Sequence, residues 1–273
     1  MSAIKSMVRD ALVQGIAPLY SRLYRGSPRI RVISLHDVAP VHYDTCRERI
    51  RWLAQTYRIV SLDQLYKKIG LDDNRLTVAL TFDDGFKEHA TFIVPLLREL
   101  SIPATFFIPS TVIGLTGEEA YAFAKNNLRR SGHFQFMNQN EVCEIAQDPL
   151  FEIGGHTAHH VDLGLVTDPI ILSSEIMEDK FALEKMINKK LNYFAYPFGS
   201  STNTSPAAIA VLKEAGYQGA FTIMPSFWTH NKNPYLIGRD SLSFTQSESV
   251  WDGFLKGGYD LISRVKTRGV GGN

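Results

Sequence analysis

Segments typical of β-strands alternate about seven times with segments typical of α-helices along this chain. The expected strands are 29–35, 58–60, 76–82, 104–108, 151–153, 192–196 and 219–223. The expected helices are 43–55, 61–69, 87–100, 140–146, 173–187 and 205–215, and Pro95 should kink the third or mark its true start. Parallel strands need helical crossovers of this kind. We therefore predict an α/β fold, a closed or nearly closed barrel.

The expected strand at 76–82 ends abruptly in two adjacent acids and a glycine, within the sequence LTVALTFDDG. Two ionised carboxylates side by side repel each other unless a positive charge lies nearby. A metal ion would supply that charge. We predict that one acid of the pair Asp83 and Asp84 binds a metal and that the other accepts a proton from water.

A histidine cluster, GGHTAHH, follows the expected strand at 151–153. His156 and His160 lie four residues apart, and together with Asp84 they form a two-histidine, one-carboxylate set typical of catalytic metal sites. His159 is the alternative ligand to His160. In a barrel of parallel strands, reactive side chains gather at the carboxyl ends of the strands, where all these residues fall.

Composition narrows the function classes. The 273 residues carry a formal net charge of +1, with 44% hydrophobic and 21% charged residues. This is typical of a globular protein without a nucleic-acid partner. Two cysteines, Cys46 and Cys143, favour a reducing compartment. With no signal-peptide pattern and no apolar run of about 20 residues, we expect a cytoplasmic protein.

The first residues form an amphipathic pattern with apolar side chains at helical spacing and Lys and Arg around them. We predict an amphipathic helix over 1–27, a catalytic domain over 28–265 and a flexible tail over 266–273. The preferred interpretation is that the helix packs on the domain. The alternative is peripheral contact of residues 1–24 with the inner face of a membrane. The stretch 111–137 is expected to be an irregular insertion with one short helix, a candidate lid or substrate-contacting loop.

Three motifs together resemble the polysaccharide deacetylase (NodB-homology) family, carbohydrate esterase family 4. They are TFDDG at 81–85, the cluster at 156–160 and YPFG at 196–199, and the similarity runs from about residue 31 to residue 239. The resemblance implies a distorted (β/α)7 barrel of the NodB-homology type and metal-dependent removal of acetyl groups from sugars.

The resemblance also implies residue roles. Asp83 would be the general base, and Asp84, His156 and His160 would bind the metal. In the third motif, Tyr196, Pro197 and Phe198 would contact the substrate. Phe198 stands where the family usually has tyrosine, but the group that would bind the oxyanion at this position is the backbone N–H, which both residues have. The ligand set suits zinc first, and it also accepts cobalt, nickel, manganese or iron.

The chain departs from the family pattern at two places. Ala195 occupies a position where many members carry an arginine that supports the base, and Arg239 is the candidate substitute. The usual C-terminal motif is absent after Arg239, whereas VISLHD stands at 32–37. This resembles the circularly permuted branch that includes poly-N-acetylglucosamine deacetylases, and it implies that His36 is the general acid. Asp240 is a candidate to orient His36.

The expected function is therefore metal-dependent deacetylation of an N-acetylated carbohydrate, such as a lipid-linked intermediate of a surface glycan. Two alternatives stay open. One is an amidohydrolase of cyclic imides or ureides on the same barrel, because the carbonyl chemistry is alike. The other is a carbohydrate-binding protein without catalysis, suggested by Ala195.

Overall fold

The computed structural model describes residue 15 and residues 30–67, 76–229 and 233–260. The helix predicted over 1–27, apart from Gly15, and the tail predicted over 266–273 lie outside this part of the chain, so the domain boundaries and the membrane contact stay predictions. Within the described residues, no helix has the length and apolar character needed to cross a membrane.

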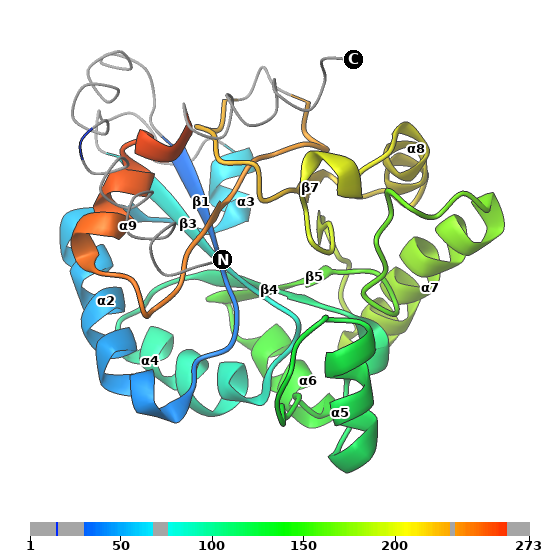
Figure 1. The fold of residues 1–273 in the computed structure, drawn as a ribbon, viewed down its shortest axis with the longest axis horizontal. Helices are drawn as coiled ribbons and strands as arrows, with labels where there is room; N and C mark the ends of the chain where they lie inside the picture. Colours follow the sequence, from blue (N-terminus) through cyan, green and yellow to red (C-terminus); the bar gives the residue numbers. More distant parts are fainter. Residues whose placement is uncertain (1–14, 16–29, 68–75, 230–232, 261–273) are drawn as a thin grey trace.

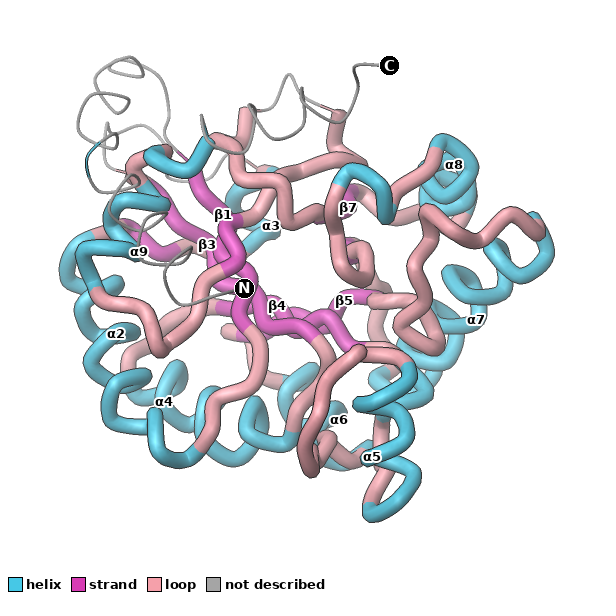
Figure 2. Tube along the Cα trace, in the orientation of Figure 1, coloured by secondary structure: helices cyan, strands magenta, loops and turns pink. Residues whose placement is uncertain are grey.

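The strands form one curled parallel sheet with helices around its outer face (Figures 1 and 2). Its order is β7-β6-β5-β4-β3-β1-β8, and β2 pairs with β3. The strands are β1 (Ile30–Leu35), β2 (Arg58–Ile59), β3 (Thr77–Asp83), β4 (Ala104–Ile108), β5 (Phe151–Gly155), β6 (Tyr193–Ala195), β7 (Gly219–Phe221) and β8 (Asp240–Ser241). The α/β class and the distorted barrel are confirmed.

The segment that leads into β8 pairs with β7 at one end and with β1 at the other, and so connects the two ends of the curled sheet. Ile237 pairs with Phe221 at the end of β7, and three residues later Asp240 pairs with Ile33 of β1. The neighbouring Arg239 therefore lies where the last part of the barrel meets the first.

The six predicted helices occur in the predicted order, with differences at their ends. The helix at 117–126 is the short one expected within 111–137, and the helix at 248–255 was not predicted. The helices are α2 (Tyr43–Thr56), α3 (Leu62–Tyr66), α4 (Val94–Glu99), α5 (Gly117–Asn126), α6 (Gln139–Gln147), α7 (Pro169–Ile187), α8 (Pro206–Glu214) and α9 (Glu248–Leu255), with short turns η1 (Pro40–His42), η2 (His89–Ile93), η3 (Ser110–Val112) and η4 (Ser201–Asn203). Pro95 stands in the first turn of α4, and the preceding turn η2 is a π-helix. Proline fits that first turn because its missing N–H would have no partner there.

Two of the boundaries that were predicted wrongly have a clear physical reason. Helix α7 begins at Pro169, four residues early, because Asp168 caps its N-terminus. Strand β5 continues to Gly155 instead of stopping at Ile153. A Cβ atom on Gly154 would come within 2.4 Å of the Phe107 ring, so this glycine permits close packing inside the barrel rather than a turn.

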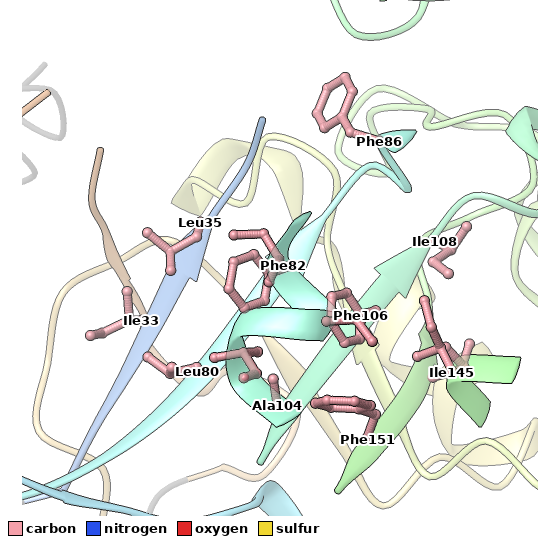
Figure 3. Close-up of a cluster of buried hydrophobic side chains, with 14 of the residues drawn as sticks. Ile33, Leu35, Leu80, Phe82, Phe86, Ala104, Phe106, Ile108, Ile145 and Phe151 are labelled. Atoms are coloured by element: carbon pink, nitrogen blue, oxygen red, sulfur yellow. The ribbon is translucent and has the colours of Figure 1, made fainter. Parts of the chain in front are cut away.

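Alternation along the strands divides the core into two clusters. On β3, Leu80 and Phe82 face the helices, and the Phe82 ring stacks on Phe106 with centroids 5.3 Å apart (Figure 3). Ala79 faces the other way, into the barrel interior with residues such as Phe107. Asp83 has the same parity as Ala79, so the end of β3 directs an acid into the barrel.

Candidate active site

The turn after β3 brings two neighbouring acids to one cavity. Asp83 still belongs to the strand, whereas Asp84 has φ of +74° and Gly85 has φ of +70°. Left-handed backbone is unfavourable for a residue with a side chain and is often found at functional sites. Because the chain turns there, both carboxylates line the same cavity although strand alternation would direct them apart.

Arg239 donates two hydrogen bonds to Asp83, from Nη1 to Oδ1 at 2.7 Å and from Nη2 to Oδ2 at 2.8 Å. The Ser34 hydroxyl donates a third at 3.0 Å. Burial raises the pKa of Asp83, but the charge and hydrogen bonds of Arg239, together with the nearby His156 and His36, outweigh burial, and the pKa is lowered. The predicted contact between Arg239 and the candidate base is thus present. Ala195, where the family arginine was expected, faces the same interior.

The predicted ligands Asp84, His156 and His160 converge, since one ligand atom from each lies within 4.8 Å of the others. Asp84 Oδ1 is 3.5 Å from His156 Nε2 and 3.3 Å from His160 Nε2. These separations exceed those of charge-assisted hydrogen bonds, which are about 2.7–2.9 Å. Asp84 Oδ1 is buried and has no hydrogen-bond partner among the described residues. All three side chains are buried.

Hydrogen bonds at the opposite ring nitrogens set the tautomers of the two histidines. His156 Nδ1 lies 2.7 Å from the Ala195 carbonyl, and His160 Nδ1 lies 3.1 Å from the Asn127 carbonyl. A carbonyl only accepts, so each Nδ1 carries the proton and each Nε2 offers a lone pair to the centre. Burial lowers the pKa of His156 and favours its neutral form. The chemistry of this donor set therefore fits a divalent cation.

Two acids one turn apart on α7 hold the histidine loop in place. Asp179 accepts a hydrogen bond from the His156 N–H at 3.0 Å, and Glu175 accepts one from the His159 N–H at 3.0 Å. The loop needs such support because His160 has φ of +53°. The His159 ring binds Glu175 at 2.8 Å and is 55% exposed, so the alternative ligand His159 was wrong.

His36 extends from the end of β1 to the cavity, with its Nε2 3.9 Å from Asp83 Oδ2. Beneath it, buried His89 contacts the His36 carbonyl through Nε2 at 3.3 Å. Burial lowers the pKa of His89 to about 4, so its ring is neutral. No spacing pattern in the sequence predicted this support from His89. Asp240 does not orient His36, since it lies on the outer side of the sheet, 3.6 Å from Arg31.

The third motif forms the turn after β6. Phe198 has φ of +59°, and no group of the described residues accepts a hydrogen bond from its N–H. Tyr196 lines the cavity, but its hydroxyl donates to the Tyr235 carbonyl at 3.0 Å. Pro197 is buried and supports the turn through its carbonyl, which accepts from the Gly199 N–H at 2.7 Å. Of the three, Phe198 therefore has the N–H that is free for an oxyanion.

These groups share one open cavity of about 660 Å³. The predicted site residues that line it are His36, Asp83, Asp84, His156, His160, Tyr196, Phe198 and Arg239. Trp228 is buried against Tyr66 in the barrel interior and does not line the cavity. The cavity thus contains an ionised acid, a convergent donor set, a partly exposed imidazole and a free backbone donor.

Comparison with known proteins gives a consistent result. The family model described as polysaccharide deacetylase matches residues 71–220. A poly-beta-1,6-N-acetyl-D-glucosamine N-deacetylase from Staphylococcus aureus is 28% identical over 220 residues, which cover 76% of this chain and 70% of that protein.

Solved structures share the fold at low sequence identity. IcaB from Ammonifex degensii has a TM-score of 0.67 at 20% identity, over 84% of this chain and 98% of that one. The Streptococcus pyogenes deacetylase PplD in complex with acetate has a TM-score of 0.64 at 16% identity, over 86% of this chain and 96% of that one.

Proposed function

The chain belongs to the polysaccharide deacetylase family, and on that premise we propose that it hydrolyses the acetamide group of an N-acetylated sugar. One observation carries the proposal: the candidate ligands Asp84, His156 and His160 converge beside Asp83, an acid that accepts two hydrogen bonds from Arg239. The name of the Staphylococcus aureus relative supports N-acetylglucosamine polymers as the substrate class.

The three ligands would hold a divalent ion, with zinc as the first candidate. The unpartnered Asp84 Oδ1 and the two Nε2 lone pairs support this assignment. When bound, such an ion supplies Lewis acidity at the acetyl carbonyl.

The chain's own groups would perform the proton transfers. Asp83 takes a proton from the attacking water, because its lowered pKa keeps it ionised at neutral pH. The Phe198 N–H donates to the oxygen that gains negative charge. Protonated His36 then gives its proton to the departing amine nitrogen, which breaks the C–N bond and yields acetate and a free amino sugar.

The rim of the cavity suits a carbohydrate. Ser241 at the end of β8 is exposed, as are Ser243 and Thr245 in the segment that follows, and all three line the cavity. Their hydroxyls can both donate to and accept from sugar hydroxyls. A lipid-linked glycan intermediate at the cytoplasmic face of a membrane is the finer form of this proposal, and cell fractionation with a lipid-extract assay tests it.

Acetate release from N-acetylglucosamine oligomers, measured together with metal content, tests the function. We expect the zinc-loaded protein to release acetate. Asp83→Asn should lose about 10²–10⁴-fold in kcat while retaining metal, because it removes a general base outside the ligand set. His156→Ala should lose both metal and activity. Full acetate release by a metal-free His156→Ala protein would refute the proposal.

A further inference from the structure

The short loop after α5, residues 127–130, contacts the histidine loop at two points. The Asn127 carbonyl accepts a hydrogen bond from His160 Nδ1 at 3.1 Å. The side chain of the same residue donates from Nδ2 to the His159 carbonyl at 2.7 Å. One residue therefore holds both the ring of a candidate metal ligand and the backbone before it.

The next contact is with the turn that presents the candidate oxyanion donor. The Arg129 guanidinium lies over the Phe198 ring, 4.1 Å from its centroid. The His160 ring contacts Phe198 edge to face at 4.8 Å. Arg129 and Phe198 both have left-handed backbone, with φ of +56° and +59°. No acid of the described residues forms an ion pair with Arg129, so the Phe198 ring is its observed partner.

The last residue of the loop reaches the segment that carries His36. Arg130 Nη2 forms an ion pair with Asp37, which directly follows His36. The Arg130 guanidinium also lies over the rings of Phe134 at 4.9 Å and Phe86 at 5.1 Å. These ring contacts hold the Arg130 side chain, which pairs with Asp37 and so anchors the chain next to His36.

We propose that loop 127–130 is a positioning element of the active site. Asn127 orients His160 toward the metal, Arg129 holds the turn that presents the Phe198 N–H, and Arg130 fixes the segment that bears His36. This inference rests on the proposed function, because those roles are the ones it assigns. The insertion over 111–137 was predicted as a lid or substrate-contacting loop. Under this proposal, its residues 127–130 instead position catalytic groups.

Arg129 is tested by the kinetics of acetate release from an N-acetylglucosamine oligomer. Arg129→Ala should lower kcat about tenfold with KM within about twofold, because a misplaced donor affects the transition state more than substrate binding. Arg129→Lys, which keeps a cation near the ring, should recover part of the loss. Arg98→Ala is the control, since Arg98 is likewise an exposed arginine whose guanidinium lies over an aromatic ring, 6.0 Å from the Phe151 centroid, and it does not line the cavity.

The control should keep the kcat of the parent protein. A parent-like kcat in Arg129→Ala, or an equal loss in Arg98→Ala, would overturn the assignment of Arg129.

Asn127 is tested by Co²⁺ titration, which needs no turnover. Asn127→Ala removes the side-chain hydrogen bond to the His159 carbonyl but keeps the backbone carbonyl that accepts from His160 Nδ1. It should weaken Co²⁺ binding about tenfold, the lower end of the usual effect of losing an outer contact of a metal site, and should shift the visible absorption of the bound ion. Asn126→Ala, on the exposed neighbour at the end of α5, should match the parent protein. Parent-like Co²⁺ affinity and spectrum in Asn127→Ala would overturn the role of Asn127. A parent protein that binds Co²⁺ but releases no acetate would contradict the proposed function, and the titration would still test the loop.

Discussion

Arg239 is the main group that favours the ionised form of buried Asp83, with smaller contributions from His156 and His36. Asp83 is only 2% exposed, and a buried carboxylate without a partner would take up a proton. Arg239 is 1% exposed and reaches it with both terminal nitrogens. A general base must be ionised before it can act, so the proposed role of Asp83 depends in large part on Arg239.

Arg239→Ala should move the acid limb of the kcat/KM profile to higher pH, because the pKa of Asp83 rises when the nearby positive charge is lost. The free energy of unfolding should fall by about 3–5 kcal/mol, the usual cost of breaking a buried ion pair. For both quantities, Arg239→Lys should lie between the parent protein and Arg239→Ala. A pH–rate profile with chemical denaturation measures both effects.

Arg31→Ala is the control for Arg239→Ala. Arg31 forms a buried ion pair with Asp260 at 2.9 Å on the helix side of the sheet. Its loss should cost stability while the acid limb stays in place. If both variants moved the limb equally, the effect on Asp83 would be a general consequence of destabilisation.

If His36 is the general acid, its substitution should lower kcat more on substrates with poor leaving groups than on substrates with good ones. An amine must be protonated before it departs, whereas a nitrophenolate leaves without a proton. His36→Gln should therefore lose about 10²–10⁴-fold in kcat on an N-acetylated sugar but much less on 4-nitrophenyl acetate. Equal losses on the two substrates, measured with the same metal-loaded protein, would assign His36 to binding instead.

At the scale of secondary structure, long periodic segments were predictable and short or packed ones were not. The boundaries of β1, β4 and α2 agree with prediction within one residue, because each has a clear apolar period. Strand β8 has two residues, too few to show any period. Strand β5 was shortened in the prediction because Gly154 reads as a turn signal in sequence, whereas in the structure it makes room for Phe107.

The site residues likewise divide into those that could be predicted from the sequence and those that could not. Residues at strand ends, such as Asp83 and His156, were predictable because parallel strands bring those ends together. The supports were not, since His89 and the acids of α7 act through backbone contacts that leave no spacing pattern.

The support from α7 has a measurable consequence for metal binding. Asp179→Ala removes the acceptor of the Ser110 N–H as well as that of the His156 N–H. Metal affinity should fall about 10–100-fold, measured by competition with a chromophoric chelator. Glu178→Ala, on the exposed face of the same helix, should bind metal like the parent protein. Unchanged affinity in Asp179→Ala would show that the loop keeps its shape without α7.

At the scale of the whole molecule, the barrel interior contains an acid that should make stability depend on pH. Glu152 of β5 accepts a hydrogen bond from Thr105 at 2.7 Å, and burial raises its pKa to about 7. Its ordinary value is 4.5, so between these values the folded state holds a proton that the unfolded state has lost. Stability should therefore fall as pH rises through that window.

Glu152→Gln should flatten this dependence. Between pH 5 and pH 8 the parent protein should lose about 1–3 kcal/mol more free energy of unfolding than the variant, since each pKa unit corresponds to about 1.4 kcal/mol. Denaturant titrations at several pH values measure the difference. Glu144→Gln, on an exposed side chain of α6, should leave the parent slope unchanged. A variant with the parent slope would exclude Glu152 as the source.

The pairing of β1 with β8 sets the order in which a growing polypeptide can become an enzyme. His36 emerges early from the ribosome, whereas Arg239 emerges only after β7 is complete. A nascent chain that stops at β7 would already contain both acids and all the imidazoles of the centre, yet it would lack the guanidinium that holds Asp83. Translation would therefore deliver the candidate metal ligands first and the arginine that completes the candidate site last.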